Sequence, residues 1–545
     1  MIANYSTVYY DKKNHFFALV RGQSNCLHFV YWHELQKHGI RALEVGDELE
    51  AEVYYNAVSN FRGLSFNSCN RKGRIESGAT KTIENEKVAV STLRDLLVDE
   101  SITAPLIFIN CIFEDIELAD IECNRCVAFL SCEFVENFRL IRCKTIGDLW
   151  LCNSSFKKHF SLKSCRIDGN VHLEGANFTG EGGASFRGMM ADNLYLDLGI
   201  QGGSDFFWLN ELHVPGVVSI GGYFNSEIQL LGRQDESVEP ARQPLLGKLI
   251  IGKELYKNES ANKTKVQGLI RIGNIDIAEE LTVCSLDAHS VQIEKLRASY
   301  ISFVDLSLTS DLIIEFSSIG SIDCASASVG RHLKLIENRL DGLVDLSGSA
   351  TGGMTHFENN KLGREMRISL VRYTTSRFLF YPADLLFGGA KRRFFQPAKF
   401  EILQSTEDRL LGDQYCSLKH WLADTGQLDL EDVAFFHMRD YHQSKWFAKV
   451  LLGRIFGWGV RLRNIALSSL FIVGIFSLVF QALDPGSSFL HSISISTQSF
   501  ISSFFGDWSD YDPSGKTAAI VTFESFLGLL CTTVFVGAYI RKLLR

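Results

Sequence analysis

The chain has 545 residues, 46% of them hydrophobic and 22% charged, and a formal net charge of −8 at pH 7. This length exceeds what one hydrophobic core supports, so several domains are expected. The nearly balanced charge gives no indication of nucleic-acid binding by the chain as a whole. The first residues lack the apolar run of a secretory signal, so the 13 cysteines are expected to be reduced thiols in a cytoplasmic part of the protein.

Residues 1–75 contain five short segments in which apolar and polar residues alternate: TVYY, FFALV, LHFVYW, ELEAEVYY and GLSFNSC. This pattern predicts five strands and a small OB-type β-barrel. The order is similar to that of a cold-shock domain, whose Lys-Gly-Phe-Gly-Phe motif lies over residues 13–17 and whose Val-Gly-Asp/Glu turn matches residues 45–48.

The cold-shock resemblance implies aromatic side chains that stack on single-stranded nucleic acid. The positions that match this role are Tyr9, Tyr10, His15, Phe17 and His28. Acidic residues between 44 and 52 offset the basic ones, and the alternative is a barrel that docks a protein ligand or packs within the chain.

After a linker with a short helix at residues 76–105, residues 106–385 repeat. Phe113, Phe134, Phe156 and Phe178 recur about every 22 residues, within the similar strings FINCIF, FLSCEF, LCNSSF and LEGANF. A period of this length built from short alternating segments predicts a parallel β-solenoid whose inward residues stack in ladders. The Cys/Ala/Asn-x-Phe pieces resemble pentapeptide-repeat proteins, and the handedness of the solenoid stays open.

The residues of this middle region are compatible with two kinds of chemistry. Cys123, Cys126, Cys132 and Cys143 provide the four ligands that zinc needs, but the cysteines keep step with the repeat, which favours a stacked ladder without metal. The pair Asp192 and Asp197 is of the kind that cleaves polysaccharides, although strand edges in water often carry such residues. We therefore predict no enzyme activity, no metal and no cofactor.

Residues 386–455 are expected to form a helical connector, because apolar residues recur at three- and four-residue spacing. The Gly-Trp-Gly at residues 457–459 is interpreted as a hinge at the membrane surface, with Trp446 and Trp458 as anchors at the bilayer interface. The connector is either a simple linker or a lever that carries strain to the membrane segment.

Two stretches near the end of the chain, 465–483 and 517–540, are long and apolar enough to cross a bilayer. The alternative for each is a buried helix of a soluble protein. Basic residues flank both outer ends, so both termini are expected in the cytoplasm and the protein in the inner (plasma) membrane. The transmembrane domain is predicted at residues 456–545.

The loop between the two spans is too long for a plain anchor, and its residues 487–507 are predicted to enter the bilayer and return. Alternating Ser and Ile at 492–496 would also suit a strand. The order of these features resembles the two-transmembrane pore of potassium-type channels: a first span, a Ser-rich segment, a Gly-Asp pair, an acidic mouth and a second span. That resemblance implies four chains around one pore and a filter at Ser502, Ser503, Phe504, Phe505, Gly506 and Asp507.

Phe504 stands where the family has a glycine, so the pore is predicted to be cation-conducting without a stated selectivity. Asp510 and Asp512 would line its mouth. Glu524 in the second span is either functional or a hydrogen-bonding group behind the filter.

The prediction for the whole chain is a homotetrameric ion channel in the lipid bilayer, with solenoid and barrel as a cytoplasmic sensor. The alternative is a membrane-anchored scaffold or a nucleic-acid-sensing protein in which the spans serve only as an anchor.

Overall fold

The computed structural model describes residues 81–101, 105–179, 182–198, 206–232, 245–252, 263–363, 366–381, 403, 408–505 and 515–543, and the backbone of five strands between residues 2 and 70. The chain forms two compact units. The first comprises Met1–Arg367, Tyr373–Ser376 and Tyr381–Lys391, and the second comprises Ile368–Arg372, Arg377–Phe380 and Arg392–Arg545.

The N-terminal strands are β1 (Ile2–Tyr10), β2 (Phe17–Arg21), β3 (Leu27–Tyr31), β4 (Glu48–Asn56) and β5 (Phe61–Asn70). They form an antiparallel five-stranded sheet in the order β3-β2-β1-β4-β5. The five predicted strands are therefore present. The structure does not describe the residues that would show whether this sheet closes into a barrel, so the OB-type barrel stays a prediction.

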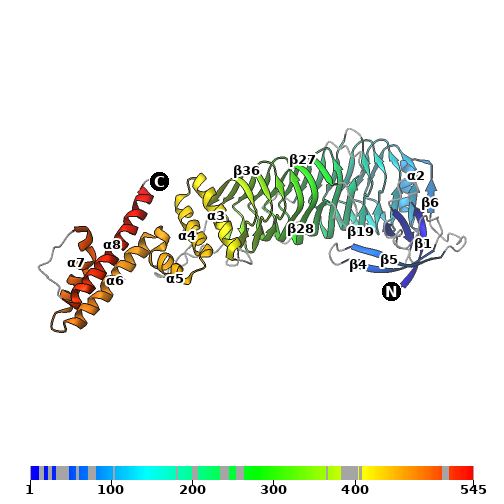
Figure 1. Ribbon diagram of the computed structural model, residues 1–545. Coiled ribbons are helices and arrows are strands. Elements are labelled where there is room, and N and C mark those ends of the chain that lie inside the picture. The colour runs from blue at the N-terminus through cyan, green and yellow to red at the C-terminus, as the bar shows by residue number, and fades with distance from the viewer. Residues whose placement is uncertain are drawn as a thin grey trace. The chain divides into compact units, whose positions relative to one another are not determined.

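The middle of the chain is a β-solenoid of about 12 turns, as the repeat predicts (Figure 1). Its strands are β6 (Lys81–Glu84), β7 (Lys87–Val88), β8 (Leu106–Ile109), β9 (Ile112–Phe113), β10 (Ile116–Ala119), β11 (Glu122–Cys123), β12 (Val127–Leu130), β13 (Glu133–Phe134), β14 (Phe138–Ile141), β15 (Lys144–Ile146), β16 (Leu149–Trp150), β17 (Ser155–Phe156), β18 (Phe160–Lys163), β19 (Arg166–His172), β20 (Asn177–Phe178), β21 (Ala184–Arg187), β22 (Met190–Leu198), β23 (Phe207–Asn210), β24 (Val214–Phe224), β25 (Ile228–Leu231), β26 (Leu245–Gly252), β27 (Thr264–Gly273), β28 (Asp276–Glu294), β29 (Arg297–Leu308), β30 (Leu312–Glu315), β31 (Ser318–Asp323), β32 (Ser328–Val329), β33 (Leu333–Ile336), β34 (Arg339–Leu340), β35 (Leu343–Asp345), β36 (Ala350–Glu358), β37 (Lys361–Leu362), β38 (Arg367–Ser369) and β39 (Thr374–Tyr381).

All pairings between coils of the solenoid that the structure describes are parallel and nearly in register. Strands β8 to β11 make one coil, and β12 begins the next because it pairs with β8. Side chains of successive coils lie 22 residues apart, as Asp120 and Arg142 do, or 21 residues apart in later coils. One coil is longer, since Ile228 of β25 pairs directly with Ile270 of β27 at a separation of 42 residues. The first coil already starts at β6, inside the segment that the sequence assigned to the linker.

Left-handed backbone turns form the corners of the first coils. Six residues spaced by about 11 have φ between 50° and 56°: Asn110, Asp120, Ser131, Arg142, Asn153 and Ser164. Their amides still join the next coil, for example Asn110 to the Leu130 carbonyl at 3.0 Å and Ser131 to the Cys152 carbonyl at 3.0 Å. Non-glycine residues disfavour this conformation, so the inter-coil ladder enforces it.

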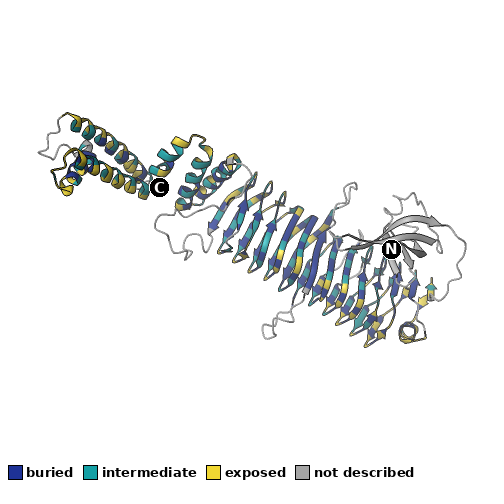
Figure 2. Ribbon diagram, turned by 90° about the horizontal axis from the view of Figure 1, so that it is seen from below, coloured by how far each residue is buried: buried dark blue, intermediate teal, exposed yellow. Residues whose placement is uncertain are grey.

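The predicted phenylalanine ladder fills the solenoid interior. Phe113, Phe134, Phe156 and Phe178 stack coil on coil, with ring centroids 5.1, 4.8 and 5.1 Å apart. A second ladder of Phe138 and Phe160 meets the first edge to face. All are at most 1% exposed. Figure 2 shows this alternation of buried and exposed residues along the solenoid strands.

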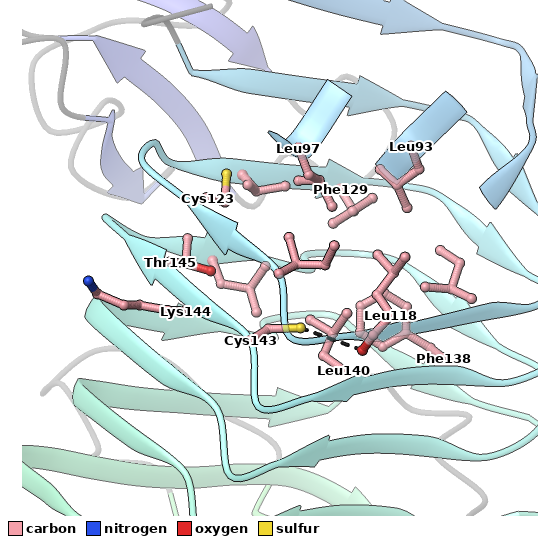
Figure 3. A pocket seen from close by; sticks show the side chains of 14 residues that line it. Leu93, Leu97, Leu118, Cys123, Phe129, Phe138, Leu140, Cys143, Lys144 and Thr145 are labelled. Carbon is pink, nitrogen blue, oxygen red and sulfur yellow. Dashed lines mark hydrogen bonds between the residues drawn. The ribbon is translucent and has the colours of Figure 1, made fainter. Parts of the chain in front are cut away.

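Helix α2 (Val90–Val98) caps the first coils, and it is the short helix predicted for the linker. Its Leu93, Leu96 and Leu97 are buried. Leu93 and Leu97 face Phe129 and Phe138 across an apolar cavity of about 30 Å³ (Figure 3). That volume holds about one or two waters, so it is a packing gap. The buried Arg125 guanidinium donates to the Leu97 and Asp99 carbonyls at the C-terminal end of α2.

The second unit is helical. Its elements are α3 (Asp408–Asp424), α4 (Leu428–His442), α5 (Trp446–Ala448), a π-helix (Lys449–Ile455), a 3-10 turn (Gly457–Gly459), α6 (Leu462–Leu483), α7 (Phe489–Phe505) and α8 (Lys516–Leu543). Helices α6 and α8 are long and apolar enough to cross a membrane, and only 17% of the apolar window of each is buried. Helices α6 and α8 thus coincide with the two long apolar stretches identified in the sequence.

Candidate functional site

The candidate site is the three-helix hairpin of α6, α7 and α8. Helix α7 occupies the segment predicted to re-enter the bilayer, and its Ser and Ile residues at 492–496 are helical rather than extended. An apolar cluster joins the three helices through Ile465 of α6, Phe500 of α7 and Cys531 and Ala538 of α8. The hairpin therefore carries a third helix that is packed against both long ones.

Gly528 allows α7 and α8 to approach closely. A Cβ atom at this position would lie 1.9 Å from the Phe500 carbonyl oxygen. By contrast, a Cβ on Gly474 of α6 or Gly537 of α8 would meet nothing within 4 Å. A glycine is required only where the two backbones touch.

Glu524 of α8 is completely buried behind α7. Its carboxyl group accepts a hydrogen bond from the Ser496 hydroxyl of α7. The same hydroxyl lies 2.9 Å from the Val473 carbonyl of α6, so one serine touches both long helices. The second carboxyl oxygen of Glu524 has no hydrogen-bond partner among the described residues. Of the two interpretations left open by the sequence, this contact favours a hydrogen-bonding role behind α7.

Further polar contacts bind α7 on both sides. The Ser525 hydroxyl of α8 donates to the Ser499 carbonyl at 2.7 Å and lies 3.0 Å from the Ser502 hydroxyl. At the other end, Ser492 donates to the Gln481 side chain of α6 at 3.1 Å. The hydroxyl groups of Ser492, Ser496 and Ser525 thus lie in the contacts between the three helices.

The predicted filter and mouth are only partly within the described residues. Ser502 lies in the last turn of α7, where its hydroxyl donates to the Ser499 carbonyl at 2.9 Å. The backbone of 503–505 continues the helix, so these residues do not present the extended carbonyls of a potassium filter. Gly506, Asp507, Asp510 and Asp512 lie outside the described residues, and the filter remains a prediction.

The outward surfaces of α6 and α8 are apolar. Their exposed large side chains include Leu470 at 70%, Phe471 at 68%, Leu478 at 61%, Phe526 at 59% and Phe523 at 57%. Helices of a soluble core bury such residues, whereas lipid or a neighbouring chain can cover them.

A charged cluster connects α4 to the end of α8, and the sequence analysis missed it. The Arg541 guanidinium of α8 lies 3.5 Å from Glu431 and 3.6 Å from Asp432, both largely buried near the start of α4. Arg541 also covers the Phe435 ring at 4.7 Å. In the sequence, Arg541 is only one of the basic residues that predict a cytoplasmic C-terminus. The available indication was the pair of acids at a helix N-terminus, where the helix dipole favours negative charge.

The predicted hinge has an unusual backbone. Gly457, Trp458 and Gly459 have φ of 54°, 50° and 72°, three left-handed residues in succession. Beside them, Arg461 stacks over the Phe436 ring of α4 at 3.6 Å, and burial lowers the pKa of this guanidinium. The sharp turn between connector and α6 is thus held by contacts to α4. Trp446 is 74% exposed, as a lipid-interface anchor would be.

The other sequence candidates are not gathered into a site. Cys123, Cys132 and Cys143 are buried with thiols directed at backbone carbonyls. In the described part of the chain, no group of three or more His, Cys, Asp or Glu side chains is arranged to hold a metal ion. Asp192 is exposed and Asp197 half-buried on β22, and burial raises the pKa of Asp192.

The nucleic-acid candidates lie mainly on the N-terminal strands. Tyr9 and Tyr10 are in β1, Phe17 is in β2 opposite Tyr31, and His28 is in β3 opposite Val20. His15 lies outside the described residues. Comparison of the chain with family models, curated proteins and solved structures finds no match.

Proposed function

We propose that the chain is one subunit of an oligomeric, cation-conducting channel of the inner membrane, with both termini in the cytoplasm. The observation that carries this proposal is α7. A plain anchor needs only a short connection between its spans, whereas here an uncharged 17-residue helix lies between them and is bonded to both. If α7 enters the bilayer, the chain that follows it is non-helical backbone within the membrane. Such backbone is stable only where protein encloses it or where it lines a water-filled cavity.

The exposed apolar surfaces of α6 and α8 support assembly in the membrane. A pore needs several copies around one axis, and side chains such as Leu470 and Phe526 remain for lipid and for neighbouring subunits. We propose a homotetramer, as in the potassium-type pores that the segment resembles. The acidic residues Asp507, Asp510 and Asp512 would then form rings that favour cations.

The cluster around Arg541 supports a role of the connector in gating. Helix α4 contacts the end of α8 through Glu431 and Asp432 and contacts the entrance of α6 through Phe436. A displacement of α4 would therefore act on both long helices. The solenoid, proposed to belong to the pentapeptide-repeat type, and the N-terminal sheet, proposed to be OB-type, would form the sensing part.

Purified full-length protein in planar bilayers tests this proposal. We expect discrete cation currents, and we expect Asp507→Asn to lower the preference for cations over chloride. Asp484→Asn is the matched control, because Asp484 lies at the end of α6 and is exposed. Silent bilayers together with a monomeric particle would rule the proposal out.

A second candidate is a membrane-anchored scaffold, favoured by the helical backbone at 503–505, where an extended filter was predicted. Removing residues 487–512 while keeping both long helices distinguishes the two. A scaffold would keep its partners and its membrane location, whereas a channel would lose its current.

A further inference from the structure

One outer side of the solenoid differs from the others in the first coils. Phe108 and Phe129 stack inside the solenoid at 5.1 Å, and alternation along a strand therefore directs Ile107, Ala128 and Leu130 outward. These outward residues form an apolar cluster of their own, separate from the interior ladders. We call it the apolar outer face; it comprises Ile107, Ala128, Leu130, Trp150 and Cys152, with Ile109 and Cys126 packed at its edge.

Aromatic side chains continue this face into the following coils. The His172 ring stacks on Trp150 with centroids 3.7 Å apart and planes 7° apart, and Tyr195 stacks on His172 at 5.0 Å. The His172 Nδ1 atom lies 3.1 Å from Glu174, which orients the ring within the stack. The face is therefore ordered as a ladder.

The neighbouring outer sides are charged. Arg142 pairs with Asp120 at 2.7 Å, and Lys144 pairs with Glu122 at 2.6 Å, with all four side chains substantially exposed. These sides suit contact with water. If nothing covered the apolar ladder next to them, it would be a large exposed apolar patch, and such patches mark interaction surfaces.

The apolar outer face is nevertheless covered. Ile107, Ala128, Leu130 and Cys152 are 0% exposed and Trp150 is 1% exposed. The strands that carry these residues cannot cover their own outward side chains. A further segment of the same compact unit must supply the cover, and this unit includes the chain from Met1 onward.

The chain enters the solenoid at the edge of this same face. Strand β6 pairs with β8, and Thr82 of β6 lies opposite Ile107. The N-terminal sheet ends at Asn70, so residues 71–80 are the tether, and ten extended residues span at most about 36 Å. The five-stranded sheet is thus held within reach of the apolar outer face.

We infer that the apolar outer face is the docking surface for the five-stranded sheet of residues 2–70 of the same chain. The sheet then belongs to the solenoid as a packed module, and the sheet surface that docks is closed to nucleic acid. This inference does not depend on the proposed channel activity.

Photo-crosslinking of the full-length protein tests the inference. A benzoylphenylalanine in place of Trp150 should crosslink within the chain to a peptide from residues 2–70, identified by mass spectrometry. The control position is Ser161 of β18 on another side of the solenoid, which should give no such product. Crosslinks to a second chain would overturn the inference. So would the absence of any crosslink together with labelling of the side chain at position 150 by a water-soluble reagent, because that side chain would then be exposed.

A substitution gives an independent readout. Ala128→Arg places a charge in the centre of the face and should speed amide hydrogen exchange in β1–β5 by about tenfold or more, with β9 and β13 still protected. Ser161→Arg should leave exchange in β1–β5 unchanged. Equal exchange in β1–β5 for both variants would contradict docking on this face.

Discussion

The solenoid and the three-helix hairpin distribute their side chains in opposite ways. In the solenoid, phenylalanine ladders are inside and ion pairs such as Arg142–Asp120 are outside. In the hairpin, Glu524, Ser477 and Ser496 are inside and Leu470 and Phe471 are outside. This contrast indicates that the two regions are adapted to different surroundings, water for one and an apolar medium for the other. Four predictions test it, from the largest expected effect to the smallest.

The largest effect is expected in the solenoid interior. Phe134→Ala removes a ring that stacks between Phe113 and Phe156 and should lower the free energy of unfolding by about 3–5 kcal/mol. Since each coil contacts only its neighbours, hydrogen exchange should rise first in β9, β13 and β17. Val135→Ala, at a position 36% exposed, is the control and should change stability little. A uniform change along the whole solenoid would refute this coil-by-coil cooperativity.

In the hairpin, the next largest effect is expected at the contact between backbones. Gly528→Ala should destabilise the detergent-solubilised protein by about 1–3 kcal/mol, because the new methyl group collides with the Phe500 carbonyl. Gly537→Ala has open space and should be neutral or slightly stabilising. Thermal unfolding monitored in detergent distinguishes the two. Equal melting temperatures for both variants would mean that α7 does not pack on α8 in this way.

The inward polar contact should contribute less. Ser496→Ala removes the hydrogen bond to the buried Glu524 and should cost about 1 kcal/mol. Adding Glu524→Leu should restore part of this loss, since no buried carboxyl group then lacks a partner. A double-mutant cycle of thermal stability measures the coupling. Additive losses would show that the two side chains do not interact.

The smallest effect is expected at the solenoid surface. The Arg142 guanidinium lowers the pKa of the Asp120 carboxyl group. A lowered folded-state pKa means that the stabilisation is present above the unfolded pKa, about 3.9, and is lost as pH falls through the folded value. Asp120→Asn should therefore reduce the melting temperature slightly at pH 7 and not at all well below pH 3. A difference that persists in strong acid would exclude the ion pair as its source.

The repeat made the solenoid largely predictable, because a ladder residue has the same neighbours in every coil. The spacing of Phe113, Phe134, Phe156 and Phe178 was enough to place them in one stack. The left-handed corners were not predicted, although Asn110, Ser131 and Asn153 mark them at a regular interval. Arg142 occupies such a corner without any local preference for it, so only the inter-coil hydrogen bonds explain it.

In the helical unit, the sequence predicted the positions of the long helices but not their contacts. Hydropathy located α6 and α8 within a few residues, because crossing an apolar layer depends on length and composition alone. It did not decide whether residues 492–496 form a helix or a strand. Nor did it show that Arg541 meets Glu431 and Asp432, which lie more than 100 residues earlier in the chain.

The sequence by itself determined the solenoid, the two membrane-length helices and a long uncharged segment between them, because periodicity and hydropathy are properties of the chain. Only the tertiary structure decided what that segment contacts. The Ser496 bridge between Val473 and Glu524 and the close approach at Gly528 join residues that are more than 20 positions apart in sequence. Such contacts depend on how elements pack, which no local pattern specifies.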